Sequence, residues 1–172
     1  MFNRRFGGLA AAAAVLLMPA ALCAEVPFTP AKGGYTIVFP EKPQEKEVAL
    51  SPSIKSTIYS VNRDDGAFLA GYTEYNEDMD VDKELAADVQ SFITSIPAQM
   101  TERKRSAIKR PDGTSVERVE FSFDGEKSAG RGVAIMTSPR SSIMVAALSI
   151  KPAGKPASVD EFVKSFKLAG QQ

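Results

Sequence analysis

The densest group of side chains that could do chemistry is an acidic stretch between residues 74 and 84. Its carboxylates are those of Glu74, Glu77, Asp78, Asp80, Asp82 and Glu84. Asp78, Asp80 and Asp82 alternate along the chain, as the first ligands of a calcium-binding loop do. The sixth and twelfth positions of such a loop should be Gly and Glu, but they are Lys83 and Val89. The calcium-loop pattern therefore fails. The three aspartates remain candidates for cation binding at the surface. The plainer alternative is a solvated loop in which Asp80 or Asp82 is the N-cap of the following helix.

The side chains that carry most enzymatic chemistry are scarce. The chain of 172 residues has no His and no Trp, and its single Cys is Cys23. Histidine is the commonest general base, and His and Cys are the usual zinc ligands. A carboxylate-based hydrolase would need two carboxylates about 5–10 Å apart in a cleft. We therefore expect a protein without catalytic residues, cofactor or structural metal, and keep the hydrolase as the alternative.

A basic stretch follows the acidic one and contains Arg103, Lys104, Arg105, Lys109 and Arg110. It could bind anionic lipid or polysaccharide. Its spacing also fits an exposed strand, with Ala107 and Ile108 turned inward. A third interpretation is that it faces the acidic stretch across the surface, where exposed ion pairs add little stability.

Two other groups have plainer interpretations. Tyr59, Tyr72 and Tyr75 lie on predicted strands, where aromatic residues more often pack in the core or at an edge than form a ligand platform. The sequence Gly130-Arg131-Gly132 lacks the third glycine and the strand–helix context of a dinucleotide-binding loop. We assign no cofactor to it.

The N-terminus is typical of a secretory signal peptide. Arg4 and Arg5 precede a short apolar run that ends in small residues, and cleavage is predicted after Ala24. The run is shorter than the ~20 residues that span a bilayer, so an uncleaved anchor is the less favoured alternative. Cys23 could instead carry a lipid, although bacterial lipoproteins usually have Gly, Ala or Ser before that cysteine and this chain has Leu22.

Composition limits the partners that the exported part could have. About 150 residues remain after residues 1–24, which suits one domain over residues 35–172, preceded by a Pro- and Gly-rich leader loop over residues 25–34. Acidic and basic residues nearly balance, which argues against nucleic acid as a partner. Without cysteine the domain cannot use disulfides, and we expect no transmembrane span after cleavage.

Hydrophobic periodicity predicts the elements of this domain. Asp64-Asp65-Gly66 predicts a tight turn, and Ser158 with Glu161 predicts a capping box. Alternation indicates strands, and spacings of three and four indicate helices. Strands are expected over residues 35–39, 54–61, 67–75, 116–123, 132–136 and 143–150, and helices over residues 82–96 and 158–166. This order predicts an α+β fold, an antiparallel sheet covered by one long central helix and one short C-terminal helix.

This layout resembles the PsbP-like fold, which includes photosystem II extrinsic subunits and bacterial envelope proteins of the DcrB type. The resemblance rests on an aromatic strand ending in Phe-Pro (residues 35–40), a Tyr-rich strand before the helix (residues 71–75) and a terminal Phe-Val-Lys-Ser-Phe-Lys (residues 162–167). It covers most of residues 35–168 and implies a non-enzymatic accessory or binding domain, with no catalytic residue to carry over.

From these observations we expect a periplasmic or secreted protein that binds another envelope protein or surface. The alternatives are the carboxylate-based hydrolase and an outer-membrane lipoprotein anchored through Cys23.

Overall fold

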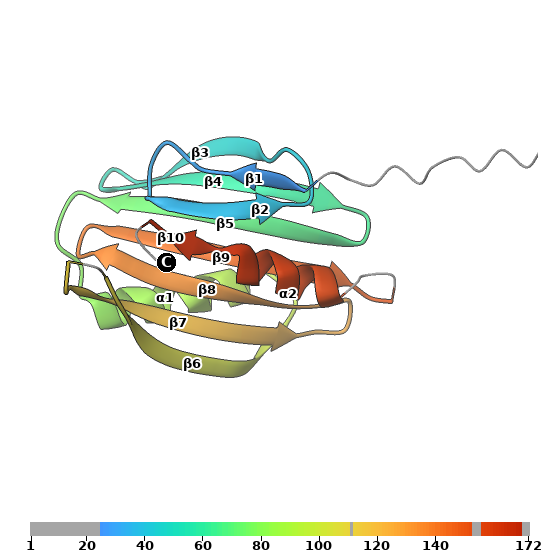
Figure 1. Ribbon diagram of the computed structural model, residues 1–172. Coiled ribbons are helices and arrows are strands. Elements are labelled where there is room, and N and C mark those ends of the chain that lie inside the picture. Colours follow the sequence, from blue (N-terminus) through green and yellow to red (C-terminus); the bar gives the residue numbers. More distant parts are fainter. Residues whose placement is uncertain (1–24, 111, 153–155, 170–172) are drawn as a thin grey trace, which may run out of the picture.

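The computed structural model describes residues 25–110, 112–152 and 156–169, which form two antiparallel sheets and two helices (Figure 1). The large sheet has the strand order β3-β4-β5-β9-β8-β7-β6, and the small sheet has the order β1-β2-β10. The helices are α1 (Val81–Thr94) and α2 (Pro156–Ser165). The strands are β1 (Val26–Phe28), β2 (Tyr35–Phe39), β3 (Gln44–Ser51), β4 (Ile54–Arg63), β5 (Gly66–Tyr75), β6 (Gln99–Lys109), β7 (Ser115–Asp124), β8 (Ser128–Ser138), β9 (Ser141–Ile150) and β10 (Lys167–Leu168).

The predicted fold class, a sheet covered by one long central helix and one short C-terminal helix, is wrong. The described part of the chain is mostly β-sheet, with 57% strand and 16% helix. Helix α1 has only 14 residues and packs mainly on β7 and β8 on one side of the large sheet. The other side is covered by α2 together with the small sheet (Figure 1). The prediction underestimated the sheet because β3 is an exposed edge strand, whose polar side chains show little hydrophobic alternation. An exposed strand was one interpretation of residues 103–110, which lie in and just after β6, but it was not included in the predicted sheet.

Two local expectations also change in the structure. Strand β1 lies within residues 25–34, the segment predicted as a leader loop, and pairs antiparallel with β2, which begins at Tyr35. Helix α2 begins at Pro156, so Ser158 lies in its first turn and cannot be the N-cap of a capping box with Glu161. Proline suits the first helical position because it has no N–H to leave unsatisfied. The predicted turn at Asp64-Asp65-Gly66 is confirmed, since Arg63 pairs with Gly66 across the hairpin of β4 and β5.

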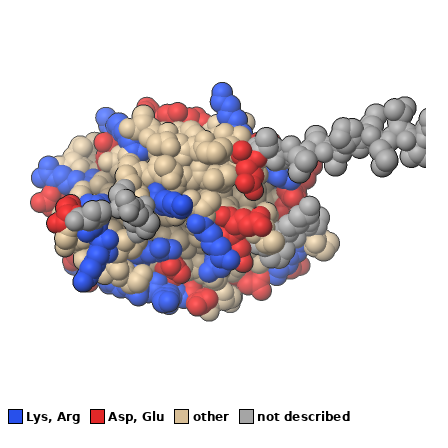
Figure 2. All heavy atoms as spheres, in the orientation of Figure 1, with Lys and Arg blue, Asp and Glu red and all other residues tan. Residues whose placement is uncertain are grey.

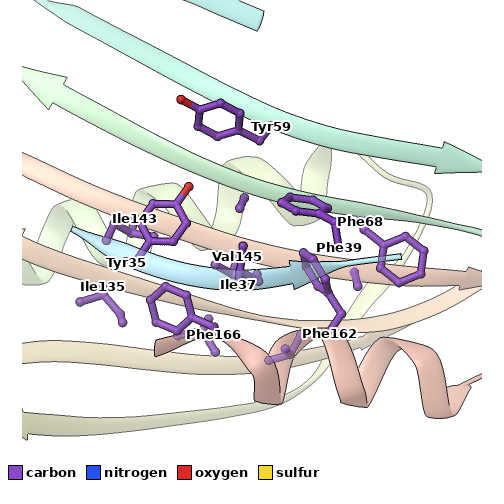
Figure 3. Close-up of a cluster of buried hydrophobic side chains, with 14 of the residues drawn as sticks. Tyr35, Ile37, Phe39, Tyr59, Phe68, Ile135, Ile143, Val145, Phe162 and Phe166 are labelled. Atoms are coloured by element: carbon purple, nitrogen blue, oxygen red, sulfur yellow. The ribbon is translucent and has the colours of Figure 1, made fainter. Parts of the chain in front are cut away.

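The large sheet separates two hydrophobic cores. The first lies between the sheet and the layer formed by α2 and the small sheet, and the second lies beneath α1. Figure 3 shows the rings of Phe39, Phe68 and Phe162 meeting in the first core, where the ring centroid of Phe162 lies 5.1 Å from that of Phe39 and 5.3 Å from that of Phe68. Residues from β2, β5 and α2 thus join both sheets through one aromatic cluster.

Tyr35 is a polar side chain at the centre of the first core. It is 1% exposed, and its hydroxyl has no hydrogen-bond partner. Burial raises the pKa of this hydroxyl, so the group stays neutral. A buried donor without a partner costs about 1–3 kcal/mol.

We therefore expect Tyr35→Phe to raise the free energy of unfolding by about 1 kcal/mol, measured by urea denaturation. The substitution removes only the hydroxyl and keeps the ring, which lies 5.7 Å from that of Phe166. Tyr59→Phe is the matched control, because Tyr59 is a buried tyrosine of the same core whose hydroxyl is not orphaned. A loss of stability in Tyr35→Phe would contradict the conclusion that the Tyr35 hydroxyl is a buried donor without a partner.

Candidate functional site

The three aspartates proposed as surface cation ligands each engage a different basic side chain. Asp78 accepts a hydrogen bond from Nε of Arg140 at 2.6 Å, and Asp82 pairs with Arg105. Asp80 lies 3.4 Å from Nζ of Lys83. Over the described ranges no group of three or more acidic side chains is placed to hold a metal ion. The three aspartates therefore form separate ion pairs and do not converge on one site.

Asp80 has a structural role as the N-cap of α1. Its Oδ1 accepts hydrogen bonds from the backbone N–H groups of Asp82 and Lys83, at 3.1 and 3.2 Å. These contacts, led by the one from Lys83, lower the pKa of Asp80. The sequence allowed either Asp80 or Asp82 as the cap, and the structure selects Asp80.

Removing this cap should destabilise α1. We expect Asp80→Ala to cost about 1 kcal/mol in the free energy of unfolding, because two N–H groups of the first turn lose their acceptor. Asp80→Asn keeps an acceptor oxygen and should cost less than half as much. Thermal denaturation of the two variants tests whether Asp80 is the N-cap. The control is Asp78→Ala, which removes an acidic side chain outside the helix. Equal losses of stability in all three variants would show that Asp80 is not the cap.

The basic stretch lies on β6, at one edge of the large sheet, except for Arg110, which follows the strand. The interpretation as an exposed strand is confirmed. Arg105 contacts Asp82 of α1 and Glu117 of β7, so one residue of this stretch does face the acidic stretch, as one interpretation predicted. These side chains are largely exposed, and the pairs contribute little stability. Ile108 is half-buried, but Ala107 is exposed. The prediction that both turn inward is therefore wrong, because neighbouring residues of a strand point to opposite faces.

The three tyrosines do not form one platform. Tyr59 and Tyr72 lie on the side of the large sheet that carries α2 and the small sheet, where the ring of Phe28 lies 4.7 Å from that of Tyr59. Tyr75 lies on the opposite side, within the core beneath α1. Tyr59 and Tyr75 are buried and Tyr72 is half-buried, so packing is the main role of all three rings.

Tyr75 belongs to a buried polar network that the sequence analysis missed. Its hydroxyl lies 2.9 Å from Oγ of Ser142 on β9, and Ser142 donates to Oδ2 of Asp88 on α1 at 3.0 Å. Burial raises the pKa of Asp88 to about 6, and the nearby Glu84 carboxylate adds to the rise. The hydrogen bond from Ser142 opposes it. No pattern in the neighbouring sequence identifies Asp88 as a member of this network. Its partner Ser142 is distant in the chain and is brought close to it by the pairing of β9 with β5.

This network contains the elements of acid–base chemistry, but two of its three side chains are closed to solvent. Ser142 is 2% exposed and Tyr75 is 5% exposed. A nucleophile or general acid has to lie within hydrogen-bond reach of its substrate. Asp88 is also absent from the linings of the two clefts described next. We conclude that the network holds α1 on the sheet.

One cleft lies between α2, β2 and the hairpin of β4 and β5, with a volume of about 680 Å³. Buried aromatic rings from all three elements form its floor: Phe39, Phe68 and Phe162. Charged side chains of both signs form its rim: Glu25, Arg63, Asp65, Glu161 and Lys164. Figure 2 shows the face that carries α2, where acidic and basic side chains border an uncharged surface. The cleft could hold a chain segment that has both apolar and charged groups.

A second cleft of about 730 Å³ lies at the C-terminal end of α1. Ile93, Ile96 and Met100 supply apolar surface, and Asp124 and Glu126 supply carboxylates. Asp124 already binds Nζ of Lys151 at 2.5 Å, and this contact lowers its pKa. The lining of this cleft has two carboxylates and no basic residue, whereas the first cleft has three carboxylates and two basic residues.

The glycines of Gly130-Arg131-Gly132 have a packing role. They lie within β8, directly opposite Phe123 and Phe121 of β7. A Cβ atom at Gly132 would lie 2.4 Å from Cζ of Phe121. Between the glycines, Arg131 binds Asp160 of α2 at 2.8 Å. The segment is therefore a strand that the two phenyl rings overlie.

The predicted cleavage after Ala24 and the possible lipidation of Cys23 lie outside the described residues. Within the described ranges, neither helix is long and apolar enough to cross a membrane.

Comparison with known proteins gives no family for this chain. No protein-family model matches the sequence, and no curated protein matches it.

Proposed function

We propose that this chain is an exported, non-catalytic binding or accessory protein of the bacterial envelope, with PsbP-like architecture, whose partner is another envelope protein. The signal-like N-terminus and the absence of His and Cys after residue 24 support this proposal. The resemblance of residues 35–168 to the PsbP-like group supports the same role.

The observation that carries the proposal is the contrast between the mostly buried polar network of Tyr75, Ser142 and Asp88 and the accessible cleft beside α2. The only described carboxyl whose pKa is raised, that of Asp88, belongs to α1 and accepts a hydrogen bond from Ser142 of the sheet. The accessible cleft instead has Arg63, Glu161 and Lys164 at its rim, above a floor formed by buried aromatic rings. Apolar surface with a few convergent charged groups is typical of recognition sites.

The test uses the full chain, exported from a bacterial host. Mass spectrometry of the purified protein should give Glu25 as the first residue, whereas a diacylglyceryl group on Cys23 would make it a lipoprotein. A photo-crosslinking amino acid at Lys164, in the rim of the cleft, should then capture a defined envelope protein in living cells. The same amino acid at exposed Asp112, which lies outside both clefts, is the control and should not capture it.

The hydrolase alternative gives a different result. The purified protein should not turn over glycan or ester substrates above the uncatalysed rate. Turnover at ordinary enzymatic rates, or equal crosslinking from Lys164 and Asp112, would overturn the proposal.

A further inference from the structure

Strand β6 leaves one long edge of the large sheet unpaired. It is the last strand in the order of that sheet, and within the described part of the chain only β7 pairs with it (Figure 1). After a bulge near Met100, the pairing runs without interruption over residues 102–109, which we call the β6 edge. Alternate residues of an edge strand direct their backbone N–H and C=O groups away from the sheet. The β6 edge therefore offers the backbone groups of about four residues to another strand.

The β6 edge is accessible. Ser106 and Ile108 are half-buried, and the other residues of the edge are exposed. Helix α1 packs mainly on β7 and β8, and α2 packs mainly on β8, β9 and β2. An incoming strand could therefore reach the backbone of β6 without displacing either helix.

The charge of the β6 edge is almost entirely positive. Its basic residues are Arg103, Lys104, Arg105 and Lys109. Its single acidic residue is Glu102. Arg105 is held by carboxylates of α1 and β7. Over the described ranges no ion pair holds the other three basic side chains, so they remain available to a partner.

These available charges lie on both faces of the sheet. Arg103 pairs with Phe121, whose ring belongs to the core beneath α1, so Arg103 projects from that face. Lys109 projects from the same face, because side chains alternate along a strand. Lys104 projects from the opposite face, where it lies across from Glu120. A strand added to β6 would therefore meet a basic side chain on either face.

The same charges disfavour a symmetric pairing of two copies of this chain. An antiparallel pairing of two β6 edges centred on Lys104 would place Lys104 opposite its counterpart and Arg103 opposite Arg105. Like charges directly opposite one another destabilise a strand pair. The other edge strand of the large sheet, β3, is a poorer complement than a wholly acidic segment, because its charges alternate in sign: Glu45, Lys46 and Glu47.

Protection against aggregation is the plainer role of charge on an edge strand. Charges of both signs can provide it, as those of β3 do. The single sign of the β6 edge has a further consequence, because it also selects the sign of the strand that can pair with it.

We propose that the β6 edge binds an extended acidic segment of a partner protein, which adds a strand to the large sheet. Backbone hydrogen bonds to residues 102–109 hold the segment, and Arg103, Lys104 and Lys109 select its Asp and Glu side chains. This inference rests on the proposed function, because it names the chemistry by which an envelope partner is bound. It uses a surface separate from the cleft beside α2.

Fluorescence anisotropy with the purified exported protein tests the proposal. The labelled peptide has about ten residues, in which Glu alternates with Val or Thr, and the comparison peptide replaces every Glu by Lys. We expect the Glu peptide to bind at least about tenfold more tightly than the Lys peptide. Equal affinities would overturn the proposal, because the basic side chains of the β6 edge would then have no role.

Backbone methylation separates strand addition from general charge attraction. Neighbouring N–H groups of a strand point to opposite edges, so N-methyl groups on alternate residues block only one edge of the peptide. Methylating one set of alternate residues should weaken binding at least about tenfold, and methylating the other set should leave the affinity within about threefold. Equal affinities of the two methylated peptides would show that the peptide does not pair with β6.

Charge reversal locates the site. Arg103→Glu together with Lys109→Glu should weaken binding of the Glu peptide about tenfold or more and strengthen binding of the Lys peptide. Phe121 and Ser115 lie across from these two residues, so the new carboxylates face no acidic residue on β7. An unchanged affinity for the Glu peptide would overturn the proposal.

The matched control is Lys42→Glu together with Lys46→Glu. These exposed residues lie just before and within β3, at the opposite edge of the sheet, and their reversal changes the net charge equally. The affinity should stay within about twofold. Equal losses in the two double variants would reject the β6 edge as the site. The methylated peptides use the unaltered protein and decide the question if the variants do not fold.

Other occupants give different results. Binding of anionic polysaccharide or anionic phospholipid vesicles that depends on Arg103, without binding of the Glu peptide, would overturn the proposal. So would a dimer or longer assembly, detected by light scattering, that the reversal at Arg103 and Lys109 abolishes. These failures would leave selective crosslinking from Lys164 intact. Failure of the proposed function would instead appear as substrate turnover or as unselective crosslinking at Lys164.

Discussion

Replacing Asp88 by Asn should stabilise the protein at neutral pH. The folded protein raises the pKa of this carboxyl from 3.8 to about 6, so it binds the proton more tightly than the unfolded chain does. The free energy of unfolding therefore falls as the pH rises from 3.8 to about 6. Above about pH 6 the destabilisation by the ionised carboxylate is fully present. One pKa unit corresponds to about 1.36 kcal/mol, which sets an upper limit of ~3 kcal/mol. Because Asp88 is half-buried and keeps some contact with water, we expect a gain of about 1–2 kcal/mol.

Urea denaturation at pH 4 and pH 7.5 measures this effect. The gain from Asp88→Asn should be present at pH 7.5 and nearly absent at pH 4, since Asn resembles the protonated carboxyl and can still accept from Ser142. Asp80, Asp112 and Asp124 have lowered pKa values and act in the opposite direction, but they are common to both proteins and cancel in the comparison. Asp82→Asn, at an exposed position of the same helix, is the control and should show no such gain. A loss of stability in Asp88→Asn at pH 7.5 would contradict the prediction.

Adding one methyl group at Gly132 should cost about 3 kcal/mol or more in the free energy of unfolding. A Cβ atom there would lie 2.4 Å from Cζ of Phe121 and 2.7 Å from the carbonyl oxygen of Val145. The ring cannot move freely, because it is 2% exposed and packs 5.8 Å from the ring of Phe92 on α1. Gly132→Ala would therefore displace either the strand or the helix.

Gly71→Ala is the matched control in the same sheet. Its Cβ atom would meet nothing closer than 3.8 Å, so the variant should stay within about 1 kcal/mol of the wild type. A double-mutant cycle with Phe121→Leu gives a second measurement, since removing the ring should relieve part of the cost of Gly132→Ala. Equal costs for the two alanine variants, or no coupling to Phe121, would rule out the packing role of Gly132. Chemical denaturation of the four variants measures both quantities.

Local signals in the sequence predicted most of the elements correctly. The turn at Asp64-Asp65-Gly66, the helix that begins after Asp80 and the alternation in β7 all depend on residues close together in the chain. A turn, a cap and one apolar face are chosen by short-range sterics and hydrogen bonds, so a short window of sequence contains the information.

The predicted fold class was wrong because edge strands show little hydrophobic alternation in their own sequence. β6 carries Arg103, Lys104 and Arg105 in succession, and it is a strand because β7 pairs with it. The covering layer depends on β2, which forms the small sheet with β1 and with the distant β10. Pairing between segments far apart in the chain is not encoded in the periodicity of either segment.

For the candidate sites, the sequence determined which chemistry is absent, and only the tertiary structure decided which groups meet. Without His, and with Cys23 as its single cysteine, the chain lacks the commonest catalytic groups whatever its fold. The partnership of Asp88 with Ser142 required β9 to pair with β5 beneath α1, across 54 positions of sequence. The role of Gly132 likewise required Phe121 to lie opposite it in the sheet. Composition is independent of geometry, whereas burial and hydrogen bonding depend on neighbours that only the folded chain brings together.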